Sequence, residues 1–241
     1  MTEKLLAIVL NVRKYNDRYN IVTVYSATRG RLVFLSSTGG GKASRLRNAR
    51  LQPMAVIEGD FRYKPNAEIQ HLGAFSLHRV WHDIYFHPVK RLLALFLSEF
   101  LNRLILESAA DAKIWNFIFN SMVLLDESRS GINDFHIAFL SSLLPFVGIQ
   151  PDISQYRAGY LFDMESGRFR ETVPAHSHFL KGEEAGIVKM VARLNFLNIR
   201  RLKLSRSLRL RILEGLINYY DIHFSGIRNI KSLEVLHEIF S

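Results

Sequence analysis

The sequence contains no cysteine among its 241 residues. Disulfides, thiolate zinc sites and a cysteine nucleophile are therefore excluded together. Disulfides are rare in the reducing cytoplasm, so this absence fits a cytoplasmic protein. Hydrophobic residues make up 48% of the chain and charged residues 22%, which is typical of a folded globular protein.

Long apolar runs are also missing. Lys4 is followed by only six apolar residues, Leu5–Leu10, which is too short for the core of a signal peptide. The apolar run over residues 92–106 is interrupted by Glu99 and Arg103, so it does not predict a membrane span. We expect a soluble, cytoplasmic protein that has no membrane partner.

Acidic residues are scarce in one part of the chain. The formal net charge is +10, from 32 Lys and Arg against 22 Asp and Glu, and a basic balance favours an acidic partner. Between residues 13 and 50 the only acid is Asp17. We predict that the cations of this segment contact DNA phosphates: Arg13, Lys14, Arg18, Arg29, Arg31, Lys42, Arg45, Arg47 and Arg50.

Five short apolar runs separated by turn residues organise the first third of the chain. The runs are Leu5–Leu10, Ile21–Tyr25, Leu32–Leu35, Met54–Glu58 and Ile69–Leu77. Five strands with turn signals every ten to fifteen residues predict a small barrel. A five-stranded, partly open barrel whose loops bind oligonucleotides is an OB-fold. Three tyrosines lie among the loop cations and are candidates for stacking on bases: Tyr15, Tyr19 and Tyr25.

Helical periodicity follows the strands. We expect helices over 89–108, 111–125, 133–146 and 183–197, one that begins after Ser205 and stops near Gly226, and a short last helix capped by Ser232. Breakers between residues 149 and 182 predict a small β insertion with a hairpin at Tyr160–Asp163 and Gly167–Phe169. Strands followed by helices indicate the α+β class. We expect an OB-fold domain over 1–78 and a helical domain over 79–241.

A second basic run lies near the C-terminus. Residues 199–211 contain six cations and no acid. A charge run is usually a solvated helix face, but the complete lack of acids favours a polyanion or an acidic protein tail. We predict DNA contacts for Arg200, Arg201, Lys203 and Arg206.

Catalytic signatures are missing. The glycines before Lys42 do not form a phosphate loop, because that pattern needs Gly at 36 and Ser or Thr at 43, where the chain has Ser36 and Ala43. We expect a mobile loop that carries Lys42 and Arg45 towards DNA. His176 and His178 have no further ligand nearby in the sequence, so no metal or other cofactor is predicted. We expect no enzyme activity.

Several motifs in order resemble the bacterial recombination mediator family RecO. They include Arg13–Arg18 between two apolar strands, the segment from Gly40 to Pro53, Gly148–Asp152, Ser205–Ser207 and the segment from Gly226 to Leu233. Together they span nearly the whole chain. Many members of that family hold zinc with four cysteines in the insertion. This chain has none, so we expect packing of Tyr156, Tyr160, Phe162 and Phe169 to hold the insertion.

The resemblance implies a non-enzymatic DNA-repair factor. Such a protein binds single- and double-stranded DNA, anneals complementary strands and acts together with RecR. It also contacts the acidic C-terminal tail of the single-strand-binding protein and helps RecA load onto DNA. The residues alone leave two alternatives open, which are an adaptor whose basic surface binds acidic protein tails and an RNA-binding OB protein.

Overall fold

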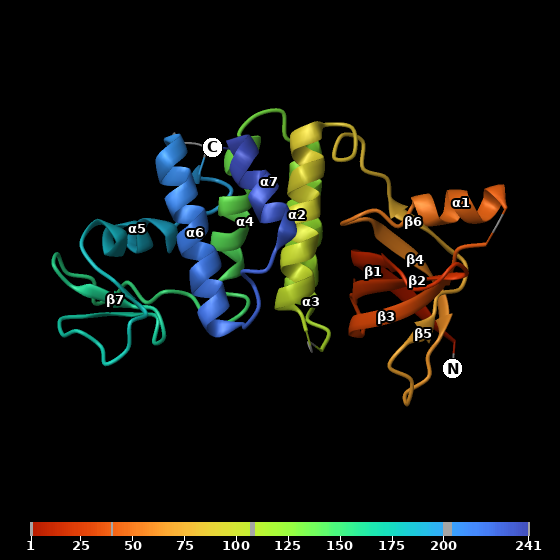
Figure 1. Cartoon of the computed structure of the whole chain (residues 1–241), viewed down its shortest axis with the longest axis horizontal. Helices are drawn as coiled ribbons and strands as arrows, with labels where there is room; N and C mark the ends of the chain where they lie inside the picture. The colour runs from red at the N-terminus through yellow and green to blue at the C-terminus, as the bar shows by residue number, and fades with distance from the viewer. Residues whose placement is uncertain (1, 40, 107–108, 200–203, 241) are drawn as a thin grey trace. The chain divides into compact units, whose positions relative to one another are not determined.

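The computed structural model describes residues 2–39, 41–106, 109–199 and 204–240 (Figure 1). The chain forms two compact units, one from residues 1–128 with 230–233 and the other from 129–229 with 234–241. Strands come first and helices after, so the predicted α+β class with an N-terminal OB-type barrel is confirmed. The domain boundary between residues 78 and 79 stays a prediction. No helix among the described residues is long and apolar enough to cross a membrane.

The barrel is one six-stranded sheet in the order β5-β3-β2-β1-β4-β6. Its strands are β1 (Thr2–Lys14), β2 (Tyr19–Ser26), β3 (Gly30–Ser37), β4 (Val56–Arg62), β5 (Gln70–His71) and β6 (Phe75–Arg79). Five strands were expected, and the difference lies in the last run, which splits into β5 and β6. Alternate residues of the strands point inwards, as the pleat requires. They pack a core of Leu5, Ala7, Val9, Val22, Val24, Phe34, Leu51, Ala55, Ile57, Phe61, Leu72 and Phe75.

The split run closes the barrel. β5 pairs with β3, while β6 pairs with β4 near the opposite edge of the sheet, and only residues 72–74 separate them. The sheet therefore curls until its edges approach one another. At Gly59 a Cβ would lie 2.5 Å from the carbonyl oxygen of Ala74. A side chain at this position would therefore prevent the close approach of β4 to the backbone just before β6.

A short helix, α1 (Lys42–Ala49), connects β3 to β4. The expectation of a mobile loop at Lys42 and Arg45 is wrong, because both residues are helical. The sequence from residue 42 supplies good helix formers such as Ala, Arg and Leu once the glycines have ended. The loop cations therefore have fixed positions on a helix.

Two longer helices complete the first unit, α2 (Pro88–Leu104) and α3 (Ala112–Glu127). Pro88 occupies the first turn of α2, and Asp111 caps α3 by accepting from two backbone N–H groups. The Asp126 carboxylate accepts hydrogen bonds from the backbone N–H groups of His82, Asp83 and Ile84 at 2.9–3.0 Å. The buried Lys90 donates to the carbonyl oxygen of Asp126 at 2.8 Å, so the turn before α2 and both helices are joined at one point.

The second unit contains the short 3₁₀ helix η1 (Ile132–Asp134), α4 (Phe135–Leu143), α5 (Glu183–Val191) and α6 (Arg206–His223). The predicted β insertion is present as a three-stranded sheet in the order β8-β7-β9, from Arg168–Arg170, Leu161–Asp163 and Phe179–Leu180. Phe169 stands 5.1 Å, ring centre to ring centre, from both Tyr156 and Phe162. Aromatic packing therefore contributes to holding the insertion.

Several helix ends differ from the expectations: the helix expected over 89–108 ends at Leu104, and the one expected over 133–146 ends at Leu143. The expected helix 183–197 stops at Val191. Ser205 caps α6 as predicted, with its hydroxyl accepting from the N–H of Leu208. Ser232 does not cap the last helix, because it lies inside α7 (Lys231–Phe240). Its N–H and hydroxyl instead donate to the carboxylate of Glu99 at 3.0 and 2.8 Å.

Candidate nucleic-acid interface

The turn between β1 and β2 is held rigidly by its own side chains. Asn16 Oδ1 accepts hydrogen bonds from the N–H groups of Arg18 and Tyr19, both at 2.9 Å. The N–H of Tyr15 donates to the carbonyl oxygen of Tyr19 at 3.1 Å. An Asn side chain that satisfies following N–H groups is the usual way to fix such a turn. The backbone positions from which the cationic side chains of this turn extend are therefore defined.

Thr38, just after β3, ties this turn to the rest of the barrel. Its N–H donates to the carbonyl oxygen of Arg18 at 2.8 Å, and its hydroxyl donates to that of Asp17 at 2.7 Å. From α1, Ser44 Oγ and Asn48 Nδ2 donate back to the carbonyl oxygen of Thr38 at 2.7 and 3.3 Å. The turn and the helix are thus fixed to the same residue.

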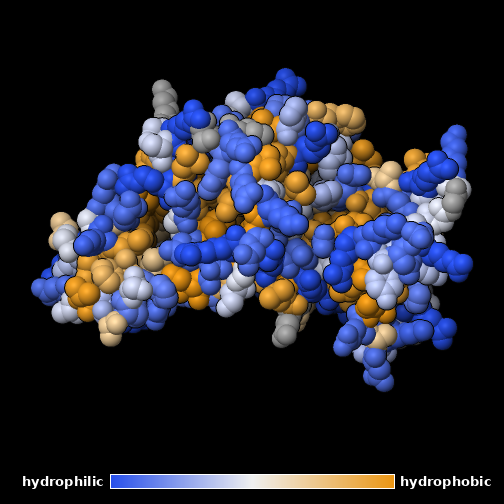
Figure 2. All heavy atoms as spheres, in the orientation of Figure 1, coloured by the Kyte–Doolittle hydropathy of each residue, from blue (hydrophilic) through white to orange (hydrophobic). Residues whose placement is uncertain are grey.

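We call residues 13–18 together with 42–50 the hairpin–helix surface. The side chains of Arg13, Lys14, Arg18, Lys42 and Arg45 are exposed on it. In the space-filling view, hydrophilic residues cover most of the visible part of the α1 region (Figure 2). The single acid of this surface, Asp17, is bound by Lys14 at 2.7 Å, and that hydrogen bond lowers the pKa of the Asp17 carboxyl.

The positive charge of the chain is concentrated in residues 13–50, the segment that contains the hairpin–helix surface. Residues 13–50 hold nine of the 32 cations and one of the 22 acids, which leaves 23 cations and 21 acids elsewhere. Outside this segment the chain is therefore close to neutral. Arg47 and Arg50 are half-buried, and Arg47 Nη2 donates to the carbonyl oxygen of Ser37 at 2.7 Å. Arg47 therefore also helps to attach α1 to the end of β3.

Arg29 has an acidic partner. Its guanidinium binds both carboxylate oxygens of Glu3, at 2.9 and 2.6 Å, and lies 4.2 Å above the ring of Tyr63. The hydrogen bonds lower the pKa of Glu3 and raise that of Arg29. The bidentate pair neutralises this cation, so it adds little to the field around the barrel.

Arg31 points towards α2. Its Nη1 donates to the carbonyl oxygens of Asn102 and Ile105 at 3.0 and 2.8 Å, at the C-terminal end of that helix. A cation suits the last turn of a helix, where carbonyl groups lack partners. Burial lowers the pKa of Arg31. DNA contact at Arg29 and Arg31 remains a prediction, and the structure gives each of them another role.

The second basic run has acidic partners that lie far away in the sequence. Arg200, Arg201 and Lys203 lie outside the described residues, and Arg206 is exposed at the start of α6. Two further cations of the run are paired, Arg209 with Asp134 and Arg211 with Glu183 and Glu184. In the folded protein, the net positive charge around this run is therefore smaller than the sequence alone suggests.

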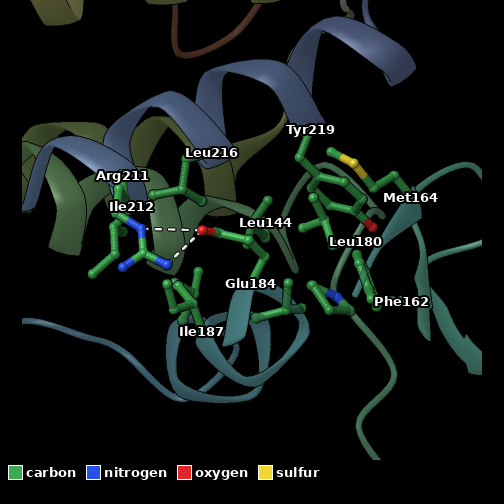
Figure 3. Close-up of a pocket in the computed structure, with 14 residues that line it drawn as sticks. Leu144, Phe162, Met164, Leu180, Glu184, Ile187, Arg211, Ile212, Leu216 and Tyr219 are labelled. Atoms are coloured by element: carbon green, nitrogen blue, oxygen red, sulfur yellow. Dashed lines mark hydrogen bonds and ion pairs between the residues drawn. The ribbon is translucent and has the colours of Figure 1, made fainter. Parts of the chain in front are cut away.

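The second unit contains a small apolar cavity between α5, α6 and the β insertion (Figure 3). Phe162, Leu180, Leu216 and other apolar side chains line it, and the ion pair between Arg211 and Glu184 borders it. Its volume is about 40 Å³, far below the several hundred Å³ of cofactor sites. Among the described residues that line it, the one cation, Arg211, is already bound to carboxylates and is not available to an acidic ligand.

One group of described residues has metal-binding atoms close together, Glu165, His176 and His178. The sequence did not reveal it, because Glu165 and the buried Asp163 come from β7 and the turn after it. His176 Nδ1 accepts from the N–H of His178 at 3.2 Å, so the proton of a neutral ring is on Nε2, where it faces the Asp163 carboxylate at 3.3 Å. A metal would need a lone pair on that nitrogen. The contacts therefore favour a hydrogen-bonded cluster.

Comparison with known proteins gives matches along the chain. The family described as Recombination protein O N terminal matches residues 1–80, and Recombination protein O C terminal matches residues 87–234. DNA repair protein RecO of Bacteroides fragilis is 34% identical over 241 residues, and that of Phocaeicola vulgatus is 33% identical, each with complete coverage of both chains. The protein of the same name from Porphyromonas gingivalis is 29% identical over 97% of each chain.

Proposed function

Because this chain belongs to the recombination protein O family, which acts in DNA repair and recombination, we propose that it binds single- and double-stranded DNA and anneals complementary strands. The observation that carries this proposal is the hairpin–helix surface. Hydrogen bonds of Thr38 with Asp17 and Ser44 join the turn and α1, which carry its exposed cations, and the chain outside residues 13–50 is almost neutral. Exposed cations gathered on connected elements can neutralise several phosphates of a nucleic acid and release their counterions.

Annealing on such a surface needs no chemical step. Two complementary strands repel each other through their phosphates, and bound cations lower this repulsion while they release counterions. Arg206, on the second unit, offers an additional point of contact with a strand. The proposed activity therefore requires no nucleotide hydrolysis and no metal, and we propose that the protein is not an enzyme.

Partners are proposed from family membership. We propose that the chain acts with RecR, contacts the acidic C-terminal tail of the single-strand-binding protein, and helps RecA load onto DNA. The small apolar cavity does not support a binding site for the tail, because Arg211 is bound to Glu183 and Glu184. The exposed cations of the hairpin–helix surface are better suited to an acidic peptide.

The test is an annealing assay with complementary fluorescent oligonucleotides, without ATP and across a salt series. We expect the protein to speed annealing and to lose this effect as salt rises. The triple variant Arg13→Glu, Lys14→Glu, Arg18→Glu should bind weakly and fail to anneal, since three cations become three anions. The proposal fails if the wild-type protein neither binds DNA nor anneals at low salt. Binding that favours RNA, or only an acidic protein, would instead support one of the two alternative functions.

A further inference from the structure

We infer that Tyr15 is a stacking platform through which the hairpin–helix surface binds unpaired bases more tightly than a duplex. This inference rests on the proposed function, because it concerns the same surface. It selects one of the three tyrosines that the sequence offered as candidates for stacking. It also gives an uncharged side chain a role in DNA binding.

Tyr15 is the tyrosine of the three that presents its ring to solvent. Its residue surface is 63% exposed, whereas Tyr25, on β2, is completely buried and its hydroxyl donates to the carbonyl oxygen of Asp111. Tyr19 is half-buried at the start of β2. Within the described part of the chain, the ring of Tyr15 has no hydrogen bond, ring contact or cation above it. Burying a large aromatic ring is favourable, so an exposed and unpartnered one is available to a ligand.

The neighbours of Tyr15 indicate which ligand this is. Arg13 and Lys14 precede it and Arg18 follows it within the same turn, and all three are exposed. A base that stacks on the ring therefore has its phosphates near cations. Aromatic rings next to a basic groove are the common solution for single strands, because every base has a face that can stack. In a duplex the bases are already stacked on one another, so the ring would gain little there.

The backbone of Tyr15 is already fixed before any ligand binds. Its N–H is bonded to Tyr19 at 3.1 Å, and Asn16 and Thr38 hold the rest of the turn. A ligand therefore has to order the side chain alone, which keeps the entropic cost of binding small.

The experiment measures the affinity of the whole protein for a single-stranded oligonucleotide, the matched duplex and an abasic strand of the same length. We expect Tyr15→Ala to weaken binding of the single strand roughly 5- to 150-fold, the range given by loss of one stacked base. Duplex affinity, abasic-strand affinity and the salt slope should not change, because no cation is removed. Tyr15→Phe keeps the ring and should keep the single-strand affinity.

A matched control is Phe86→Ala. Phe86 is 81% exposed in the same unit and lies outside the hairpin–helix surface, so its removal should leave single-strand binding intact. The inference is overturned if Tyr15→Ala has no effect, if it weakens single strand and duplex equally, or if Tyr15→Phe is as weak as Tyr15→Ala. If the wild-type protein binds no DNA at all, the proposed function itself has failed, and this result is distinct from the other three.

Discussion

At the scale of single residues, the same type of cation has different roles within one short stretch of sequence. Arg18 is exposed in the hairpin turn, Arg29 is bound to Glu3, and Arg31 binds carbonyl groups at the end of α2. Guanidinium groups are always charged, so the sequence presents these residues as equivalent. Their surroundings decide which of them is available to a phosphate.

This difference gives a prediction for Arg31→Gln. The variant should leave the dependence of DNA affinity on salt unchanged, because the guanidinium of Arg31 points towards α2. It should lower the free energy of unfolding by about 1–3 kcal/mol, the usual value of hydrogen bonds from a charged group. Arg18→Gln should leave the free energy of unfolding unchanged. It should reduce the slope of log K against log salt by about 0.7 for a single strand. Equal slopes for the two variants would contradict the assignment.

Asp126 gives a residue-scale prediction about pH. Burial acts to raise the pKa of this carboxyl, but the three backbone N–H groups lower it by more, so the folded-state pKa lies below the ordinary value. Its stabilisation should therefore be complete above the unfolded pKa of about 3.9 and be lost as pH falls through the folded value.

Asp126→Asn should remove this contribution. We expect its free energy of unfolding at pH 7 to be lower than that of the wild type by about 1–3 kcal/mol, with the difference shrinking as the pH falls below about 4. Chemical denaturation at several pH values would check this. A difference that stays constant down to pH 3 would show that the charge of Asp126 is not what stabilises the turn.

At the scale of elements, the joint between the hairpin, β3 and α1 turns scattered loop cations into one surface. Asn48 is central to it, because its side chain donates to the carbonyl oxygens of Ser37 and Thr38. These bonds attach a helix of eight residues, which would be marginal in isolation.

We therefore expect Asn48→Ala to weaken DNA binding although no charge is lost. Detached from Thr38, α1 would hold its cations less regularly, so affinity should fall several-fold while the salt slope stays nearly the same. Fluorescence binding titrations would measure both quantities. Asn66→Ala, an exposed asparagine in the turn before β5, is the control and should bind as the wild type does. An unchanged affinity for Asn48→Ala would mean that the joint is not needed for binding.

The elements themselves were largely predictable from the sequence, because their signals are local. The barrel strands, the main helices and the cap Ser205 follow from periodicity and from the residues next to them, whereas Asp111, expected as the first helical residue, is the cap of α3. The glycines at 39–41 concealed α1, since they favour a loop and the helix begins directly after them. The last predicted strand is divided because residues 72–74 belong to neither β5, which pairs with β3, nor β6, which pairs with β4.

The candidate site was predictable only in part. The concentration of positive charge in residues 13–50 is a property of the sequence. The ion pair of Arg29 with Glu3 and the contact of Arg31 with Asn102 join residues 26 and 71 positions apart. No local pattern shows such pairs, because they depend on how the barrel closes and where α2 packs. The cluster around His176 escaped prediction because it depends on how the strands of the β insertion pair.

At the scale of the whole molecule, the central claim is that one surface carries the affinity for DNA, while the chain outside residues 13–50 is nearly neutral. The direct test compares two variants of equal charge. One replaces Arg13, Arg18 and Lys42 with Gln on the hairpin–helix surface. The other replaces Arg62, Lys64 and Lys113 with Gln, three exposed cations elsewhere in the same unit.

The measurement is the slope of log affinity for a single-stranded oligonucleotide against log salt, for the wild type and both variants. The account predicts that the first variant loses about two from the magnitude of this slope, since each phosphate contact contributes about 0.7. The second variant should keep the wild-type slope. Equal slopes in both variants, with the fold of each intact, would contradict the claim that DNA is bound by the hairpin–helix surface.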